Sequence, residues 1–143
     1  MLQRSAQADI LRNYSVPMSR DEQLSTGALF GLSLAALREA RGSETEWANV
    51  VSMTNTSLVL AEYGFGPEHE PALVSALDGL FRAKERAQRT GKWGLDGDAM
   101  RAVALAFDVH QAQVEVVGQG HYTAAMNVVK QRVERGDIYR QAS

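Results

Sequence analysis

Apolar residues recur at helical spacing along most of the chain, and the periodic runs are separated by short connections that contain glycine. Two runs begin with a capping box, "SRDE" at 19–22 and "SETE" at 43–46, in which serine and glutamate satisfy backbone N–H groups at a helix start. No segment shows convincing strand alternation. Because short connections make consecutive helices antiparallel neighbours, the sequence predicts an all-α fold, a compact bundle of about five helices.

The chain has the length of one ordinary domain. It contains 143 residues, of which 45% are apolar, enough for a buried core. The first residues have weak periodicity and end at Pro17, so we expect an N-terminal arm over 1–17, either flexible or a short, loosely docked helix. Residues 18–143 are expected to form the helical bundle domain.

Charge and composition exclude several classes of protein. A formal net charge of −2 gives no global attraction to nucleic acid, and the absence of cysteine excludes disulfides, thiolate zinc sites and cysteine nucleophiles. No apolar run approaches the roughly 18–20 residues that cross a bilayer, and the N-terminus lacks the apolar region of a signal peptide. We expect a soluble, cytoplasmic protein with no membrane partner.

The stretch "RTGKWGLDGDAM", residues 89–100, is the one that most resembles a chemical site. A P-loop would need an earlier glycine and a serine or threonine after its Gly-Lys pair, and this stretch has neither. An EF-hand loop would need more than two carboxylates. We therefore interpret the stretch as a turn: Gly91 ends one helix, Trp93 folds back onto the core, and Asp96 or Asp98 caps the next helix.

His110 lies on the apolar stripe of the fourth predicted helix, where a ligand or catalytic base is one interpretation. We favour a hydrogen-bonded histidine at the edge of the core, because no second histidine or acid stands four residues away on that face. With His69 and His121 the chain has three scattered histidines, which match neither zinc nor di-iron patterns. We predict no metal and no cofactor.

The run "MTNTSL", residues 53–58, places a polar turn inside an otherwise apolar helix. Such side chains compete for backbone hydrogen bonds. We favour an arrangement in which Thr56 and Ser57 face solvent while Asn55 makes a buried hydrogen bond that fixes the helix register. In the alternative, Asn55 lines a small polar cleft together with His110.

Charge is segregated along the sequence. Residues 43–81 contain six acids and no lysine or arginine, whereas residues 82–92 contain five cations and one acid. On a helix, Arg82, Arg86 and Arg89 share one face. A second basic group follows in the last helix and tail: Lys130, Arg132, Arg135 and Arg140. Solvated helix faces explain this pattern. In an alternative interpretation, a basic edge binds an anionic partner and an acidic edge binds a cationic one, or the two edges meet in a self-contact.

The segment from Trp47 to Gly136 resembles a group of small prophage-encoded proteins of proteobacteria that have no assigned activity. The matching features are Trp47 with Asn55, "LAEYGFG" at 60–66, "RTGKWGLDGD" at 89–98 and the closing "VERGD". The resemblance implies an accessory role in a phage or mobile element and transfers no catalytic residue. Small phage proteins of this type commonly act by binding a host or phage protein.

Three hypotheses for function follow. The first is a non-enzymatic accessory protein that binds and modulates a host or phage protein, for example an anti-defence inhibitor such as an anti-CRISPR. Its contacts would come from Arg82, Arg86, Arg89, Lys92 and Trp93, with self-association as a further possibility. The second is a nucleic-acid-binding transcriptional regulator using the basic 82–92 face, although no clean helix-turn-helix is evident. The third is an enzyme built on the Asn55–His110 cleft.

Overall fold

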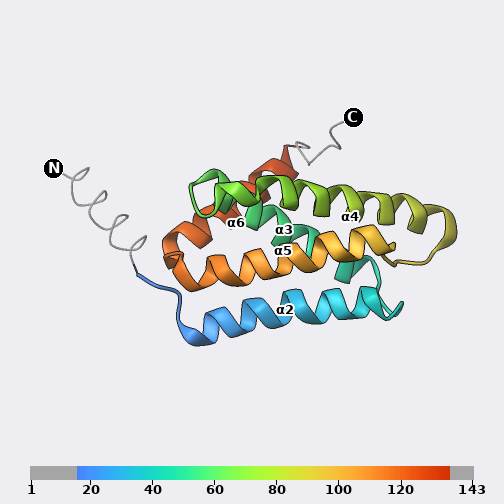
Figure 1. Cartoon of the computed structure of the whole chain (residues 1–143), viewed down its shortest axis with the longest axis horizontal. Coiled ribbons are helices and arrows are strands. Elements are labelled where there is room, and N and C mark those ends of the chain that lie inside the picture. Colours follow the sequence, from blue (N-terminus) through green and yellow to red (C-terminus); the bar gives the residue numbers. More distant parts are fainter. Residues whose placement is uncertain (1–15, 136–143) are drawn as a thin grey trace.

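The computed structural model describes residues 16–135 and confirms the all-α fold, with five α-helices and no β-strand in that range (Figure 1). The helices are α2 (Arg20–Arg38), α3 (Glu44–Glu62), α4 (Glu70–Thr90), α5 (Gly97–Val116) and α6 (Gln119–Glu134), with a 3-10 turn η1 (Pro67–His69) before α4. The predicted arm lies outside the described residues except for Val16 and Pro17. These two are attached to the connection between α5 and α6, where the Gln119 N–H donates to the Val16 carbonyl at 2.7 Å.

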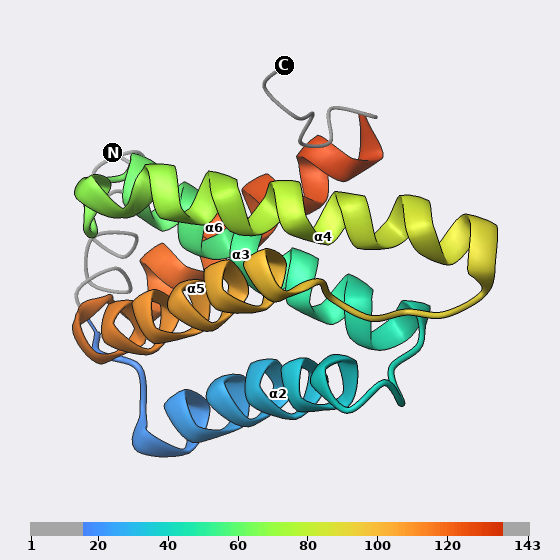
Figure 2. The same cartoon turned by 45° about the vertical axis from the view of Figure 1, so that its right-hand side comes forward.

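Helix α3 is the centre of the bundle and contacts each of the other four α-helices. Helices α2, α5 and α4 follow one another across the front of Figure 1, with α3 and α6 behind them. The turned view of Figure 2 keeps α2 at one edge of the bundle. Within the described residues, no helix is long and apolar enough to cross a membrane.

Both predicted capping boxes are confirmed. The Ser19 hydroxyl accepts from the Glu22 N–H at 3.1 Å, and the Glu22 carboxylate accepts from the Ser19 N–H at 3.4 Å. Ser43 and Glu46 form the same reciprocal arrangement at the start of α3. Each box satisfies backbone donors that a helix start leaves without intrahelical partners.

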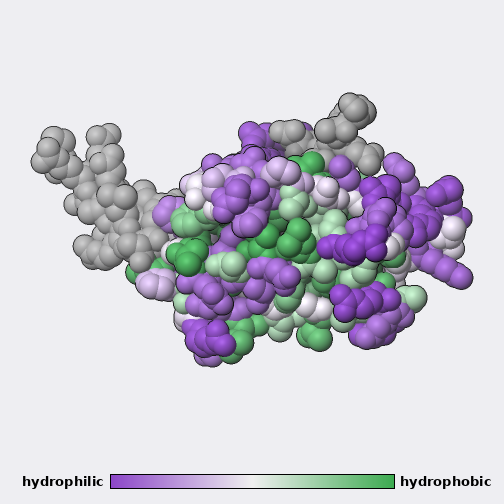
Figure 3. All heavy atoms as spheres, in the orientation of Figure 1, coloured by the Kyte–Doolittle hydropathy of each residue, from purple (hydrophilic) through white to green (hydrophobic). Residues whose placement is uncertain are grey.

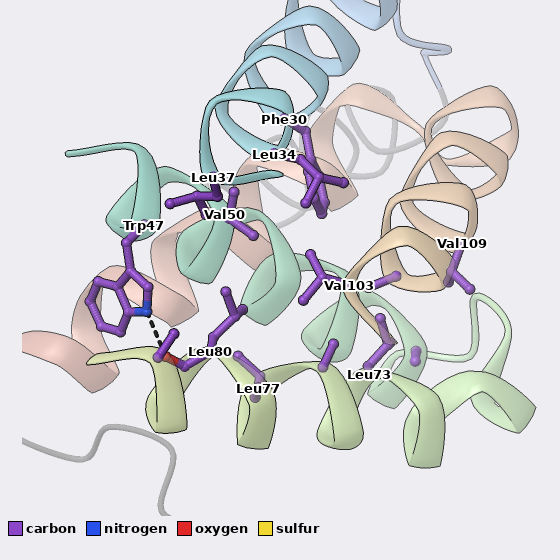
Figure 4. Packing of buried hydrophobic residues seen from close by; sticks show 14 residues of the cluster. Phe30, Leu34, Leu37, Trp47, Val50, Leu73, Leu77, Leu80, Val103 and Val109 are labelled. Atoms are coloured by element: carbon purple, nitrogen blue, oxygen red, sulfur yellow. Dashed lines mark hydrogen bonds between the residues drawn. The ribbon is translucent and has the colours of Figure 1, made fainter. Parts of the chain in front are cut away.

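The main core lies where α2, α3, α4 and α5 meet (Figure 4). Phe30, Val50, Leu77 and Val103 are completely buried in it. Trp47 closes one end of this core, and its indole N–H donates to the Leu80 carbonyl at 2.7 Å. A buried indole needs such an acceptor, so this bond fixes how α3 packs against α4.

The expected orientation of the polar turn in α3 is wrong. Thr56 and Ser57 are buried, whereas the Asn55 side chain is half-buried and makes none of the hydrogen bonds found in residues 16–135. The reason is the central position of α3, which leaves it little solvent-facing surface. The two threonine hydroxyls are satisfied within the helix: Thr54 donates to the Val50 carbonyl at 2.7 Å, and Thr56 donates to the Ser52 carbonyl at 2.9 Å.

Helix α2 ends without a glycine in the left-handed position that glycine usually takes there. Ala40, not Gly42, takes the left-handed conformation, with φ 59°. The Arg41 N–H donates to the Ala36 carbonyl at 3.0 Å, the long bond of a Schellman motif. Gly42 is needed for space instead, because a Cβ there would lie 2.5 Å from the Leu37 side chain.

The last two helices are not read correctly from apolar spacing alone. Helix α5 continues through its β-branched end to Val116, and Gly120 lies inside α6. Helical spacing would place Met126 and Val133 on one stripe with Tyr122, but both are about half exposed, and Tyr122, Ala125 and Val129 form the buried side of α6. Helix α6 packs chiefly against α3, so a narrower stripe is sufficient to bury it.

Candidate functional site

The glycine-bearing stretch between α4 and α5 is a turn, as the sequence predicts. Gly91 ends α4 in the left-handed conformation with φ 73°. Asp96 caps α5, since its carboxylate accepts from the Ala99 N–H at 2.7 Å. Asp98 lies in the first turn of α5 and pairs with exposed Arg101. The aspartates of this stretch are therefore used for helix capping and a local ion pair.

Trp93 folds back onto the core, also as predicted. Its backbone forms an isolated antiparallel bridge with Gly42, which joins the α4–α5 turn to the α2–α3 turn. Its ring lies 5.6 Å from the Trp47 ring, centroid to centroid, and is partly buried. Phe81 meets Trp47 edge-on at 5.7 Å. Trp93 therefore supports the neighbouring surface and presents only part of its ring to solvent.

The predicted basic face of α4 is assembled around one acid. Asp96 Oδ2 lies 3.4 Å from Arg82 Nε and 3.8 Å from an Arg86 terminal nitrogen. The hydrogen bond from the Ala99 N–H, followed by the contribution of Arg82, lowers the pKa of Asp96 below its usual range. These surface pairs are part-exposed, so each contributes at most about 1 kcal/mol to stability.

The other cations of this region differ in their contacts. Lys84 lies over the Trp47 ring, with Nζ 5.2 Å from the ring centroid, a cation–π contact that sequence analysis did not anticipate. Arg89 and Lys92 are exposed and take part in no ion pair among residues 16–135. We call Arg82, Arg86, Arg89 and Lys92, together with the adjacent Trp93, the basic end of α4.

The acids do not form one edge. Glu44 and Glu46 begin α3 and lie near the α4–α5 turn, whereas Glu62, at the other end of α3, is roughly 27 Å away by helix rise. Glu62 pairs with Arg132 of α6 at 3.1 Å. The sequence segregates the acids, but the antiparallel fold distributes them to opposite ends of the bundle.

The second basic group is less concentrated than its sequence suggests. Arg132 is paired with Glu62, while Lys130 and Arg135 are exposed on α6. Arg140 lies outside the described residues. This group therefore presents two exposed cations within the described part of the chain, on a different helix from the basic end of α4.

His110 is completely buried and hydrogen-bonded, in agreement with the favoured core interpretation. Its Nε2 lies 2.9 Å from the Tyr122 hydroxyl, and its ring packs against Phe30 with centroids 5.3 Å apart. Burial lowers the pKa of His110 to about 4 and raises the pKa of Tyr122. A substrate has no access to the imidazole in this arrangement.

A second buried polar contact joins α5 to α3. The Gln113 amide nitrogen donates to the Ser57 carbonyl at 3.0 Å and to the Phe65 carbonyl at 3.1 Å. The Ser57 hydroxyl and the Gln113 carbonyl oxygen make no hydrogen bond. Gln113 thus fastens the chain after α3 to the bundle, a role that no periodic pattern marks in the sequence.

In the part of the chain that the structure describes, no group of three or more histidine and carboxylate side chains is placed to hold a metal ion. Comparison of the chain with protein-family models, with curated proteins and with solved structures finds no match.

Proposed function

We propose that this chain is a non-enzymatic accessory protein of a phage or other mobile element, which binds a host protein through the basic end of α4 and modulates it. An inhibitor of a host defence complex belongs to this class. The observation that carries the proposal is the pair of exposed cations, Arg89 and Lys92, that lack acidic partners among residues 16–135. Cations at a helix C-terminus also interact favourably with the negative end of the helix macrodipole, so their position is compatible with the fold.

A protein partner fits the surrounding charges better than nucleic acid. Asp96 offsets Arg82 and Arg86, and the bridge between Gly42 and Trp93 brings the acidic start of α3 to the same end of the bundle. A phosphate backbone is negative throughout, so neighbouring acids repel it. A protein surface can match both signs, which gives specificity as well as attraction.

An aromatic cluster lies at the same end of the bundle. Trp47, Phe81 and Trp93 pack together there, and Lys84 lies over the Trp47 ring. A well-packed end changes its shape little on binding, which lowers the cost of association. The proposed contact is therefore a small charged patch on a well-packed end of the bundle.

Affinity capture tests the proposal. The tagged full-length chain is incubated with bacterial lysate, one half of which is treated with nuclease, and captured proteins are identified by mass spectrometry. We expect a protein in stoichiometric amount in both halves. Recovery of nucleic acid, with the proteins lost after nuclease treatment, would replace this proposal with the nucleic-acid-binding alternative. That alternative also predicts affinity that falls steeply with salt.

A further inference from the structure

Helix α2 lies at the edge of the bundle and packs mainly against α3 and α5 (Figures 1 and 2). Its opposite side faces outward and carries three exposed leucines. Leu24, Leu29 and Leu32 keep 53%, 44% and 69% of their surface exposed. Green apolar atoms are visible along the lower edge of Figure 3, where α2 lies.

The outward side of α2 is also uncharged. No residue from 23 to 37 is acidic or basic, and the exposed positions between the leucines are Ser25 and Ala28. A helix at the surface of a soluble protein normally carries polar or charged residues on its outer side, whereas a helix that is apolar all round is buried. The composition of α2 therefore indicates that its outer side is covered in the functional protein.

The two ends of α2 carry opposite charges that are available for contact. Asp21 and Arg38 are both exposed, and neither takes part in an ion pair among residues 16–135. Glu22, in contrast, is engaged with the Ser19 N–H and with the Gln119 side chain. When a second α2 lies antiparallel to the first, the acid at the start of each helix lies beside the base at the end of the other. The two uncharged centres then face each other.

We propose that the outer side of α2 packs antiparallel against the α2 of a second copy of this chain, across a two-fold axis. A two-fold contact uses the same patch on both copies, and residues equally far from the axis face each other. Placing the axis level with the middle of α2, between positions 29 and 30, sets exposed Asp21 opposite exposed Arg38.

A further pair agrees with this register, since Leu24 lies opposite Ala35 and a large side chain then meets a small one. Antiparallel packing also opposes the two helix dipoles. One helix pair buries less than about 1,200 Å², the size of weak and reversible complexes, so dimer formation should depend on concentration.

Sedimentation of the full chain over a range of concentrations tests this contact. We expect a monomer–dimer equilibrium, weakened at least about tenfold by Leu32→Lys because a charge is then placed in the contact. Val116→Lys is the matched control, since Val116 is 72% exposed on α5, and it should leave the dimer unchanged. Circular dichroism establishes that both variants fold. A wild-type chain that stays monomeric up to roughly 1 mM, or a dimer indifferent to Leu32→Lys, would overturn the proposal.

Charge exchange tests the antiparallel register. Asp21→Arg and Arg38→Asp should each weaken the dimer about threefold to tenfold, because each places like charges opposite one another. The double variant should regain wild-type affinity, and so should a mixture of the two single variants, since both restore opposite-charge pairs. If the wild type, the two single variants and the double variant all dimerise with the same affinity, antiparallel pairing is excluded.

Discussion

The Asp96 carboxylate lies 3.4 Å from Arg82 Nε, which joins the start of α5 to the basic face of α4. The same carboxylate accepts the Ala99 N–H at 2.7 Å. One side chain therefore caps a helix and also offsets part of the positive charge of the proposed binding surface. Its two roles can be separated, because asparagine retains the capping acceptor and removes the charge.

Asp96→Ala should lower the free energy of unfolding by about 1 kcal/mol, because the cap of α5 is lost. Asp98→Ala is the control, since Asp98 is exposed and its pair with Arg101 is local; it should cost no more than about 0.5 kcal/mol. Urea denaturation measures both. Equal losses would contradict the assignment of the cap to Asp96.

Asp96→Asn should leave the stability nearly unchanged and tighten binding to an acidic protein surface. The neutral amide frees Arg82 and Arg86 from their shared acid. We expect a gain of about threefold to tenfold in affinity for the captured partner, measured by calorimetry at low salt. A weaker complex would mean that Asp96 itself contacts the partner.

The starts of helices could be predicted from sequence better than their ends. Ser19 and Ser43 were placed correctly because a capping box is a contact between residues three apart. The end of α2 could not be predicted in this way, because Ala40 adopts the left-handed conformation that glycine usually takes at a helix end. Gly42 is required by the approach of Leu37, which depends on the folded turn.

Substitutions at Ala40 and at Gly42 should change the free energy of unfolding in opposite directions. Ala40→Gly should stabilise the protein by about 0.5–1 kcal/mol, because glycine takes a positive φ without strain. Gly42→Ala should destabilise it by about 1–3 kcal/mol, because the new Cβ would meet buried Leu37. Thermal unfolding of the two variants checks the prediction, and the opposite order would contradict the structure of this turn.

Sequence periodicity could not place the polar residues of α3. The sequence predicts Thr56 and Ser57 on the solvent side because an ordinary surface helix has one apolar face. Helix α3 instead contacts four helices, and that arrangement follows from the tertiary fold. The partner of His110 was missed for a similar reason, since Tyr122 lies on the next helix and not four residues away.

Burial of His110 should make the fold sensitive to mild acid. The pKa of His110 is about 4 in the folded protein, below its ordinary value of 6.5. Between these values the unfolded chain binds a proton that the folded chain does not, so stability falls as pH decreases from 6.5 toward 4. The loss attributable to His110 is on the order of 3 kcal/mol by pH 4.

His110→Gln is the control for this pH dependence, because glutamine does not titrate and can still bond to Tyr122. The variant should lose less stability than the wild type between pH 7 and pH 5, as measured by urea denaturation. Parallel losses would show that His110 does not cause the acid sensitivity.

The candidate surface was only partly predictable. Arg82, Arg86 and Arg89 share a face because of helix geometry, and the sequence indicates this directly. The offset by Asp96 and the stacking of Lys84 on Trp47 depend on how the α4–α5 turn returns to the core. The exposed side of α2 has a sequence signal in its long uncharged span, which helical spacing alone does not reveal.

The most direct test of the proposed binding surface compares two charge reversals in the same capture experiment. Arg89→Glu with Lys92→Glu alters the basic end of α4, and Lys130→Glu with Arg135→Glu makes an equal change in net charge on α6. We predict that the first pair releases the captured protein and that the second retains it, while both keep the helical signal. Equal retention by the two double variants would contradict the assignment of binding to the basic end of α4.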